Sequence, residues 1–201
     1  MCFFTKQTKT AIELQNRFKA KLKDTENFTT GDFNGFGFPK TPVITNEDTT
    51  QIQFLNWGLI PVWAKDETIR KNTLNARIET IYEKPTFKSI VKNRCLIIAN
   101  GFYEWQWLDE KGKQKQKYLI SLPDNELIAF AGLWSLWQNK TINQTIGTYT
   151  ILTTEANELM SKIHNTKKRM PLIISQENEF DWLAGKPQIL QNERLIATKI
   201  N

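Results

Sequence analysis

The stretch that decides the fold is Arg94–Leu108, which reads RCLIIANGFYEWQWL. Its first part, Arg94–Ala99, is a short and almost continuous apolar run, which is typical of a strand buried on both faces. Its second part, Gly101–Leu108, is rich in aromatic residues and has the length of a strand. The sequence therefore predicts two successive strands at the centre of the protein.

Further strands are predicted on both sides of this stretch. They are Gln51–Trp57, Tyr118–Leu122, Leu127–Trp134 and Thr148–Thr153. Turn-rich or charged pieces such as DEKGK and QNKT separate them. The Gly-rich, Pro-ended stretch Gly31–Pro42 predicts an ordered loop.

Helical patterns appear between the strands. Thr10 and Glu13 resemble a capping box. The residues expected on one face of the following helix are Ala11, Leu14, Phe18 and Leu22. A second helical piece covers about 77–83 and resumes past Pro85 through Val91. A third begins after Thr153 or Thr154 with Ala156, Leu159, Met160 and Ile163 on one face, and a fourth runs from near Ser175 to a C′ glycine at Gly185.

Strands in succession with inserted helices predict an α+β fold with a mainly antiparallel, curled sheet flanked by helices. A doubly wound nucleotide-binding fold is disfavoured. The glycine pair Gly35 and Gly37 lacks both the third glycine and the preceding strand of that motif. We expect one domain over residues 1–201, because linkers and repeats are absent.

Composition and charge narrow the classes of function. The chain has 27 Lys and Arg against 21 Asp and Glu, a net charge of +6, which suggests a polyanionic partner. No apolar run approaches the length that spans a bilayer, so we expect no membrane partner. The first residues, MCFFTKQTK, lack a signal peptide, so we expect a cytoplasmic protein associated with the nucleoid. Two cysteines without zinc-ligand spacing lead us to expect no metal and no cofactor.

Glu104 is the first candidate for chemistry. Alternation places Phe102, Glu104 and Gln106 on one face of their strand and Tyr103 with the Trp residues on the other. A carboxylate within so apolar a strand is destabilising unless it is paired or hydrogen-bonded. One interpretation is a salt bridge or an exposed sheet edge; the other is a tuned carboxylate that faces a pocket.

Cys2 and His164 are two further candidates. Cys2 follows the initiator Met, and a small second residue normally permits removal of Met1, which leaves a free α-amine and a thiol on one residue. Cys95, inside the apolar run, is expected to be a buried thiol. His164 is the only histidine, at the end of a predicted helix, where a cation that interacts with the helix dipole is the simpler interpretation.

Three polar residues have simple structural alternatives. Asn75 could be a helix N-cap. Arg77 could pair with a carboxylate. Arg169, in KKRMP, could lie in a solvated loop.

Four motifs occur in order: MC at the start, NAR-x-E at 75–79, RC-x5-GFYEW at 94–105 and H-x4-RMP-x-I-I at 164–174. Together they resemble the SRAP family, the SOS response-associated peptidases, which are also described as abasic-site processing proteins. The resemblance implies a β-rich α+β fold with a central sheet or barrel. It also implies a basic channel for single-stranded DNA.

The resemblance further implies a covalent DNA–protein crosslink to abasic sites, formed as a thiazolidine by an N-terminal cysteine that here is Cys2 after loss of Met1. It implies active-site roles for Asn75, Glu104 and His164. Arg77, Trp63 and Arg169 would contact DNA, which could include junctions of single and double strands. Self-removal of Met1 and reversal of the crosslink, as peptidase or lyase activity, are implied as well. Nothing in the sequence demands more than a monomer.

This chain departs from the family pattern near the expected nucleophile. The family commonly begins MCGR, whereas Phe3 and Phe4 follow Cys2 here. The family's Asn-x-Ala-Pro loop is replaced by NGFGFP at Asn34–Pro39. Ile98 and Asn100 stand where a proline and an acidic residue are customary.

Two other functions fit parts of the sequence. An N-terminal-nucleophile cysteine amidohydrolase would also begin with Cys after loss of Met1, but it would leave Glu104 and His164 unexplained. A non-catalytic module that binds single-stranded nucleic acid would use the basic charge and the aromatic residues alone. Such a module would function unchanged with Cys2 replaced by alanine.

Overall fold

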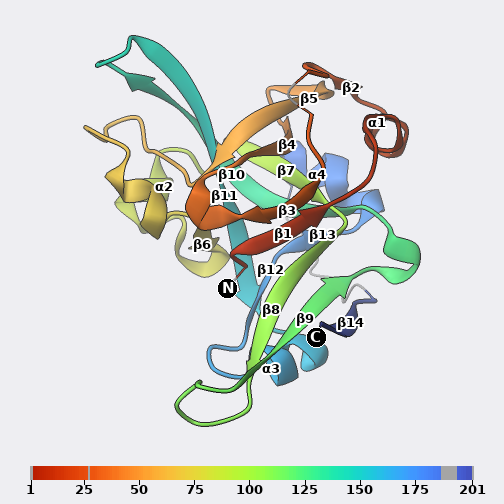
Figure 1. Cartoon of the computed structure of the whole chain (residues 1–201). Helices are drawn as coiled ribbons and strands as arrows, with labels where there is room; N and C mark the ends of the chain where they lie inside the picture. The colour runs from red at the N-terminus through yellow and green to blue at the C-terminus, as the bar shows by residue number, and fades with distance from the viewer. Residues whose placement is uncertain (1, 27, 187–193, 201) are drawn as a thin grey trace.

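Two β-sheets make up most of the protein, and the computed structural model describes residues 2–26, 28–186 and 194–200 (Figure 1). The larger sheet contains β2 (Lys21–Leu22), β4 (Lys40–Thr45), β5 (Asp48–Trp57), β6 (Asn75–Arg77), β7 (Arg94–Ala99), β10 (Ile128–Asn139), β11 (Gln144–Glu155), β12 (Arg169–Pro171) and β13 (Ile173–Ile174). The smaller sheet contains β1 (Phe4–Gln7), β3 (Gly31–Asn34), β8 (Gly101–Trp107), β9 (Lys115–Ser121) and β14 (Ile196–Ile200). Most pairs are antiparallel, which confirms the predicted fold class.

Five strands of the larger sheet close into a barrel. The order β11-β10-β7-β4-β5 is antiparallel at each step, and β5 then pairs in parallel with β11. At this seam Trp57 lies opposite Tyr149, and their rings stack with centroids 6.2 Å apart. The Tyr149 hydroxyl is 2.7 Å from Thr41 Oγ1, so its polar atom is satisfied inside the barrel. The expected curled sheet is therefore a closed one.

Strand β7 is buried on both faces, as its apolar run predicts. Cys95 and Ile97 belong to one hydrophobic cluster, whereas Leu96 and Ile98 belong to the other. The first cluster also contains Trp57, and the second lies under the helices. Successive side chains of a strand point to opposite faces, so a strand between two cores must be apolar throughout.

The smaller sheet continues directly from the barrel. Asn100 joins β7 to β8, and its Oδ1 accepts the Thr8 N–H at 2.8 Å while its own N–H donates to the Lys6 carbonyl at 2.9 Å. These bonds tie the end of β1 to the start of β8 and help to fix the antiparallel register in which Phe4 pairs with Tyr103. The register brings the start of the chain next to the middle of β8.

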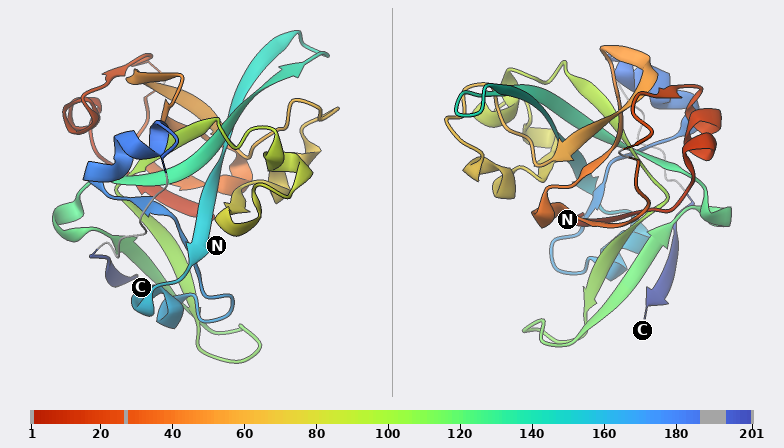
Figure 2. Two further views of the ribbon diagram at one scale, coloured as in Figure 1. Left: turned by 180° about the vertical axis from the view of Figure 1, so that it is seen from behind. Right: turned by 45° about the horizontal axis from the view of Figure 1, so that its top comes forward.

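Short helices surround the sheets (Figure 2). The α-helices are α1 (Ala11–Phe18), α2 (Pro85–Lys88), α3 (Glu158–Ile163) and α4 (Glu179–Leu183). The 3-10 helices are η1 (Gly35–Gly37), η2 (Thr68–Asn72), η3 (Ile78–Thr80), η4 (Pro123–Asn125) and η5 (Gln176–Asn178). The capping box of α1 is confirmed, and so is the left-handed glycine at 185, with φ of 84°. No helix in the described part of the chain combines the length and apolar character needed to cross a bilayer.

Four local predictions are wrong. The third helix does not begin after Thr153 or Thr154, because β11 continues to Glu155 and α3 begins only at Glu158. Gly31–Pro42 is not a loop, because it contains β3, η1 and the start of β4. Helix α1 ends at Phe18 with a left-handed Lys19, so Leu22 lies in β2 instead of on the helix. The region 77–83 forms only the single turn η3, because residues 75–77 pair with β11 as a strand. In each case pairing with a distant strand overrides a local helical or turn preference.

Candidate active site

Cys2 lies just before β1, and its side chain is completely buried. It belongs to the hydrophobic cluster that includes Trp57 and Phe102, and its Sγ is 3.9 Å from the Phe4 carbonyl. Burial raises the pKa of the Cys2 thiol well above its ordinary value, and the negative charge of Glu104 raises it further. The sulfur is therefore held as a neutral thiol at physiological pH.

Glu104 lies on the inward face of β8, where alternation predicts it. Its side chain is only 7% exposed, and Oε1 accepts the N–H of Trp105 at 3.1 Å. The exposed-edge interpretation is wrong, because β8 lies between β1 and β9. The carboxylate acts electrostatically on both Cys2 and His164. The negative charge of Glu104 thus affects the pKa of both the Cys2 thiol and the His164 imidazole.

His164 is the C-cap residue of α3 and is buried. Its Nδ1 lies 2.8 Å from the carbonyl oxygen of Arg169 and 3.1 Å from the amide nitrogen of the same residue. Burial lowers the pKa of His164 below its ordinary 6.5, and the charge of Glu104 opposes this only in part. His164 thus stands at the helix C-terminus as expected, but burial favours its neutral form over the expected cation.

Asn75 is the first residue of β6, which pairs in parallel with β11, so it is not a helix N-cap. Its Nδ2 donates to the Cys2 carbonyl at 2.8 Å. Its Oδ1 is buried and has no hydrogen-bond partner among the described residues. A buried acceptor without a partner is destabilising, so this oxygen is suited to accept a donor from a bound molecule or from a rearranged N-terminus.

Arg169 lies beneath the site at the start of β12, and the solvated-loop interpretation is wrong. Its two terminal nitrogens donate to the two carboxylate oxygens of Glu79 at 2.8 and 2.9 Å, and Nη2 also donates to the Thr153 carbonyl at 2.7 Å. The Arg169 side chain is 9% exposed. This geometry supports a role in holding β12 against His164, and it gives no support to a direct phosphate contact.

Arg77 and Trp63 remain at the surface. Arg77 ends β6 and is exposed, and its charge contributes weakly to a lowered pKa of Glu79. Trp63 is 56% exposed in the loop before η2, where the neighbouring Ala64 carbonyl accepts the indole N–H of Trp137 at 2.7 Å. The structure therefore gathers Cys2, Asn75, Glu104 and His164 and leaves these two side chains outside.

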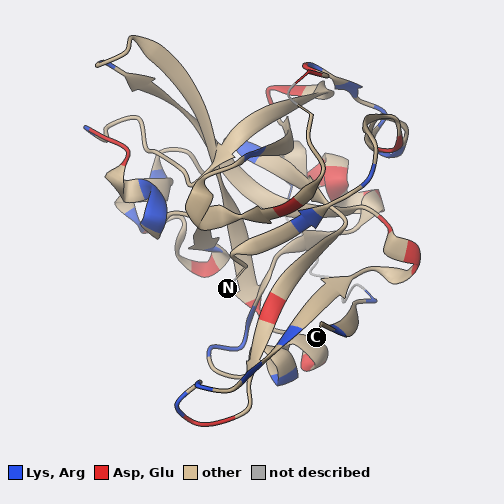
Figure 3. Ribbon diagram, in the orientation of Figure 1, with Lys and Arg blue, Asp and Glu red and all other residues tan. Residues whose placement is uncertain are grey.

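A pocket of about 210 Å³ opens beside Glu104 and His164. The residues that line it are Phe3, Glu104, Trp105, Trp107, Lys115, His164, Thr166 and Lys167. Sequence reasoning assigned no role to Phe3, Trp105, Trp107, Lys115, Thr166 or Lys167. The departure from MCGR could have indicated Phe3, and the pattern of residues along β8 could have indicated Trp105 and Trp107. Lys115 lies over the Trp107 ring at 5.1 Å, and Lys167, from the loop between α3 and β12 that Figure 3 shows to be basic, lines the same pocket.

The fold and the site define a closed β-barrel protein with a buried cysteine near its N-terminus, flanked by a carboxylate, an imidazole and an amide. The family model described as SOS response associated peptidase (SRAP) matches residues 1–199. This chain belongs to the SRAP family, as the four ordered motifs predicted.

Several relatives are similar over much of the chain. The abasic site processing protein YoqW of Bacillus subtilis is 46% identical over 154 residues, 75% of this chain and 66% of that protein. The abasic site processing protein HMCES of Gallus gallus is 32% identical over 153 residues, 64% of this chain and 44% of that protein. A crystal structure of a Bacteroides thetaiotaomicron protein superposes with a TM-score of 0.89 at 34% identity and covers 100% of this chain and 92% of its own. The match therefore spans less than two thirds of the length of either named relative.

Proposed function

We propose that this protein processes abasic sites in single-stranded DNA by forming a covalent thiazolidine crosslink through Cys2. The observation that carries the proposal is the arrangement around Cys2. Asn75 holds its carbonyl, Glu104 and His164 supply acid and base groups, and an open pocket adjoins them. The names of YoqW and HMCES support the same substrate.

The first step uses the α-amine of Cys2 after Met1 is removed; residue 1 itself lies outside the described residues. An abasic deoxyribose is in equilibrium with an open-chain aldehyde. The amine attacks its carbonyl carbon, and loss of one water gives a Schiff base. An α-amine has an ordinary pKa of about 7.7–8.0, so a substantial fraction is neutral at physiological pH, unlike a lysine near 10.4.

The second step closes the ring. The Cys2 sulfur adds to the imine carbon, the S–H proton is taken up by the nitrogen, and a five-membered thiazolidine results. Attack within one residue has a high effective concentration. Because burial raises the pKa of the thiol, little thiolate exists beforehand. A neighbouring base is therefore needed to relay the proton from sulfur to nitrogen.

The surrounding residues have separate tasks in this proposal. Glu104 positions and deprotonates the amine. His164, kept largely neutral by burial, shuttles protons during opening of the sugar ring and reversal of the Schiff base. Asn75 orients Cys2, and its unpartnered Oδ1 accepts a donor from the sugar or the amine.

The path of the DNA uses surface groups. Arg77 binds the adjoining phosphate, and Trp63 contacts the DNA near the lesion, where single and double strands could meet. Arg169 does not contact the DNA in this proposal; it holds β12 and His164 in place. We propose a monomer acting in the cytoplasm, with peptidase removal of Met1 and lyase-type release as further activities of the same site.

Denaturing gel electrophoresis of the protein with single-stranded DNA that contains one abasic site tests the proposal. The wild type should form a heat-stable adduct, and Cys2→Ala should form none. Cys95→Ala is the matched control, since Cys95 is the other buried thiol and lies within β7. Intact mass should show loss of Met1 in active protein. A wild-type level of adduct from Cys2→Ala would falsify the assignment.

Two further measurements separate the rival functions. An amidohydrolase should release ammonia from glutamine or peptide amides, and an abasic-site protein should not. A simple binding module should bind single-stranded DNA without any adduct and should be unaffected by Cys2→Ala.

A further inference from the structure

Two aromatic rings that no motif assigns are in contact beside the pocket, and one of them, Phe3, lines it. The rings of Phe3 and Phe36 have centroids 5.0 Å apart and are tilted by 37°. Phe3 lines the pocket together with Glu104 and His164. Phe36 is 51% exposed, although most large apolar side chains of the described residues are buried. One face of an aromatic pair is therefore open to solvent beside the candidate nucleophile.

The main chain holds Phe36 in place. Its N–H donates to Asn34 Oδ1 at 3.0 Å, and the N–H of Gly35 donates to the Phe3 carbonyl at 2.8 Å. A side chain on Gly35 would come within 3.2 Å of the Trp57 indole, so this residue packs directly on the barrel core. Phe38 closes the turn with a left-handed φ of 52° and donates its N–H to the Gly35 carbonyl at 2.9 Å. Phe36 thus projects from a well-anchored turn.

We propose that Phe36, braced by Phe3, is a stacking platform for the nucleobase next to the abasic nucleotide. This inference rests on the proposed function and extends it to recognition of the neighbouring base. Loss of a base from DNA leaves the adjacent base without its stacking partner on one side. An aromatic side chain can replace that partner, and such stacking tolerates any base because every base has a π-face.

The position of the pair favours a base over other occupants. Phe3 follows Cys2 directly in the chain, so one ring of the pair belongs to the neighbour of the residue that carries the reacting groups. Lys115 and Lys167 on the same pocket supply positive charge for the phosphates on either side of such a base. Here Phe3 occupies the position at which the family commonly has glycine.

The test uses single-stranded oligonucleotides with a central tetrahydrofuran, a stable abasic analogue without an aldehyde, so that binding is measured without the covalent step. The neighbouring nucleotide is either adenosine or a base-free spacer, on the 5′ side and on the 3′ side in turn. Fluorescence anisotropy should show that the wild type binds adenosine on one side about 5- to 100-fold more tightly than the spacer. Phe36→Ala should abolish that preference, and Phe36→Tyr should restore it.

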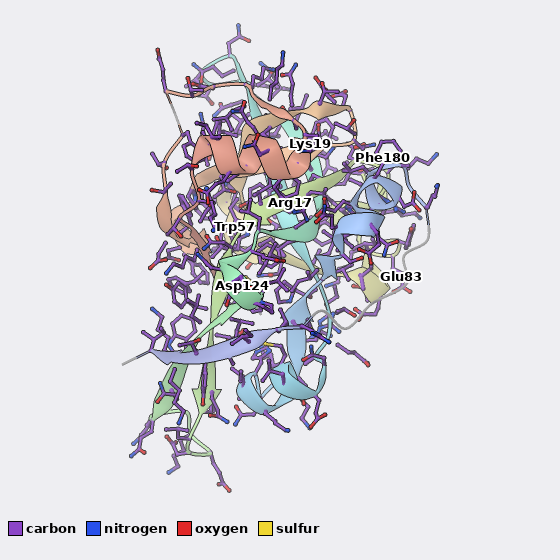
Figure 4. The ribbon with its side chains drawn as sticks, turned by 90° about the vertical axis from the view of Figure 1, so that its right-hand side faces the viewer. Arg17, Lys19, Trp57, Glu83, Asp124 and Phe180 are labelled. Atoms are coloured by element: carbon purple, nitrogen blue, oxygen red, sulfur yellow. The ribbon has the colours of Figure 1, made fainter. Side chains whose placement is uncertain are left out.

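Phe180→Ala is the matched control. Phe180 is 68% exposed on α4 and lies well apart from Trp57, which underlies the platform (Figure 4). This variant should keep the wild-type preference. Equal preference in the wild type and Phe36→Ala would overturn the inference, as would a wild type that does not distinguish adenosine from spacer on either side.

Crosslinking to a genuine abasic site separates this inference from the proposed function. Phe36→Ala should need more DNA to reach half-maximal adduct but should show an unchanged maximal rate, because the ring does not touch the reacting atoms. A lowered maximal rate with unchanged half-saturation would refute stacking. If the wild type forms no adduct while Phe36 still governs the base preference, the proposed function fails and the platform stands.

Discussion

The side-chain amide of Asn75 donates a hydrogen bond to the main-chain carbonyl of Cys2, with 2.8 Å between Nδ2 and the oxygen. The two residues are 73 positions apart in the chain, and this bond links the edge of the larger sheet to the start of the smaller one. Glu104 approaches the same cysteine from β8. Asn75 therefore holds the main chain of Cys2 and Glu104 acts on its thiol electrostatically, and only the folded chain brings these residues together.

Removal of the Asn75 amide should slow crosslinking markedly while it lowers the free energy of unfolding only slightly. We expect Asn75→Ala to reduce the rate of adduct formation by about 5- to 100-fold, because a buried hydrogen bond that orients Cys2 is lost. Asn56→Ala is the control, since Asn56 Nδ2 makes a similar bond to the Gly147 carbonyl at 3.0 Å at the barrel seam. Both variants should lose about 0.5–1.5 kcal/mol of stability in urea unfolding. Equal crosslinking rates for the two would contradict a role for Asn75.

Arg77→Ala should weaken binding to single-stranded DNA by roughly 1–3 kcal/mol, because a charge-assisted phosphate contact is lost. Since phosphate contacts release counterions, the slope of log K against log salt should fall by about one unit. Lys21→Ala is the control, because Lys21 is exposed in β2, which pairs with β5 at Gln51 and Ile52, away from the barrel seam at Asn56 and Trp57. A titration at several salt concentrations decides the matter, and an unchanged slope for Arg77→Ala would argue against the contact.

Glu79→Gln should destabilise the protein at pH 5 to 7, and the difference from the wild type should shrink as the pH falls below 4.5. Arg169 lowers the pKa of Glu79 below its ordinary 4.5, so the stability from this pair is present above 4.5 and is lost as the pH falls through the folded-state pKa. Glu79 is 45% exposed, so solvent screening limits the loss to about 1–2 kcal/mol. Thermal melts from pH 7 to pH 3 should show the two curves converging. Glu158→Gln, which breaks the exposed pair with Lys162, should change little.

Glu104→Gln and His164→Ala should give different pH profiles. If Glu104 deprotonates the amine, Glu104→Gln should be slowest at low pH and partly rescued above pH about 8, where the amine loses its proton unaided. His164 has a lowered pKa, so the neutral ring already predominates at pH 7. His164→Ala should slow release from a preformed adduct more than adduct formation, and high pH should not restore it. Identical profiles in both directions would refute this division of tasks.

Local sequence patterns predicted those features of the fold that depend only on the repeat of a single strand or helix. The apolar run of β7 predicted burial on both faces, and the alternation in β8 placed Glu104 on the same face as Phe102, which the structure shows to be buried. Both depend on the fixed two-residue period of a strand. The capping box of α1 was readable for the same reason, because its hydrogen bonds join residues three positions apart.

Where long-range pairing decided the structure, local patterns were misleading. The region 77–83 has a helical pattern but forms only the short turn η3, because residues 75–77 pair with β11 as a parallel strand. Gly31 begins β3 instead of a loop, because β1 supplies the hydrogen bonds. Sequence spacing carries no information about such partners, which are tens of residues away.

The sequence by itself determined which reactive groups the protein has: a cysteine at position 2, one histidine, and a carboxylate on the inner face of an apolar strand. Only the tertiary structure decided their chemical state. Burial lowers the pKa of His164 and raises that of the Cys2 thiol, and the Glu79 carboxylate engages Arg169. The physical reason is that desolvation and charge pairing depend on every atom packed around a group, and the fold brings those atoms from elements that are far apart in the sequence.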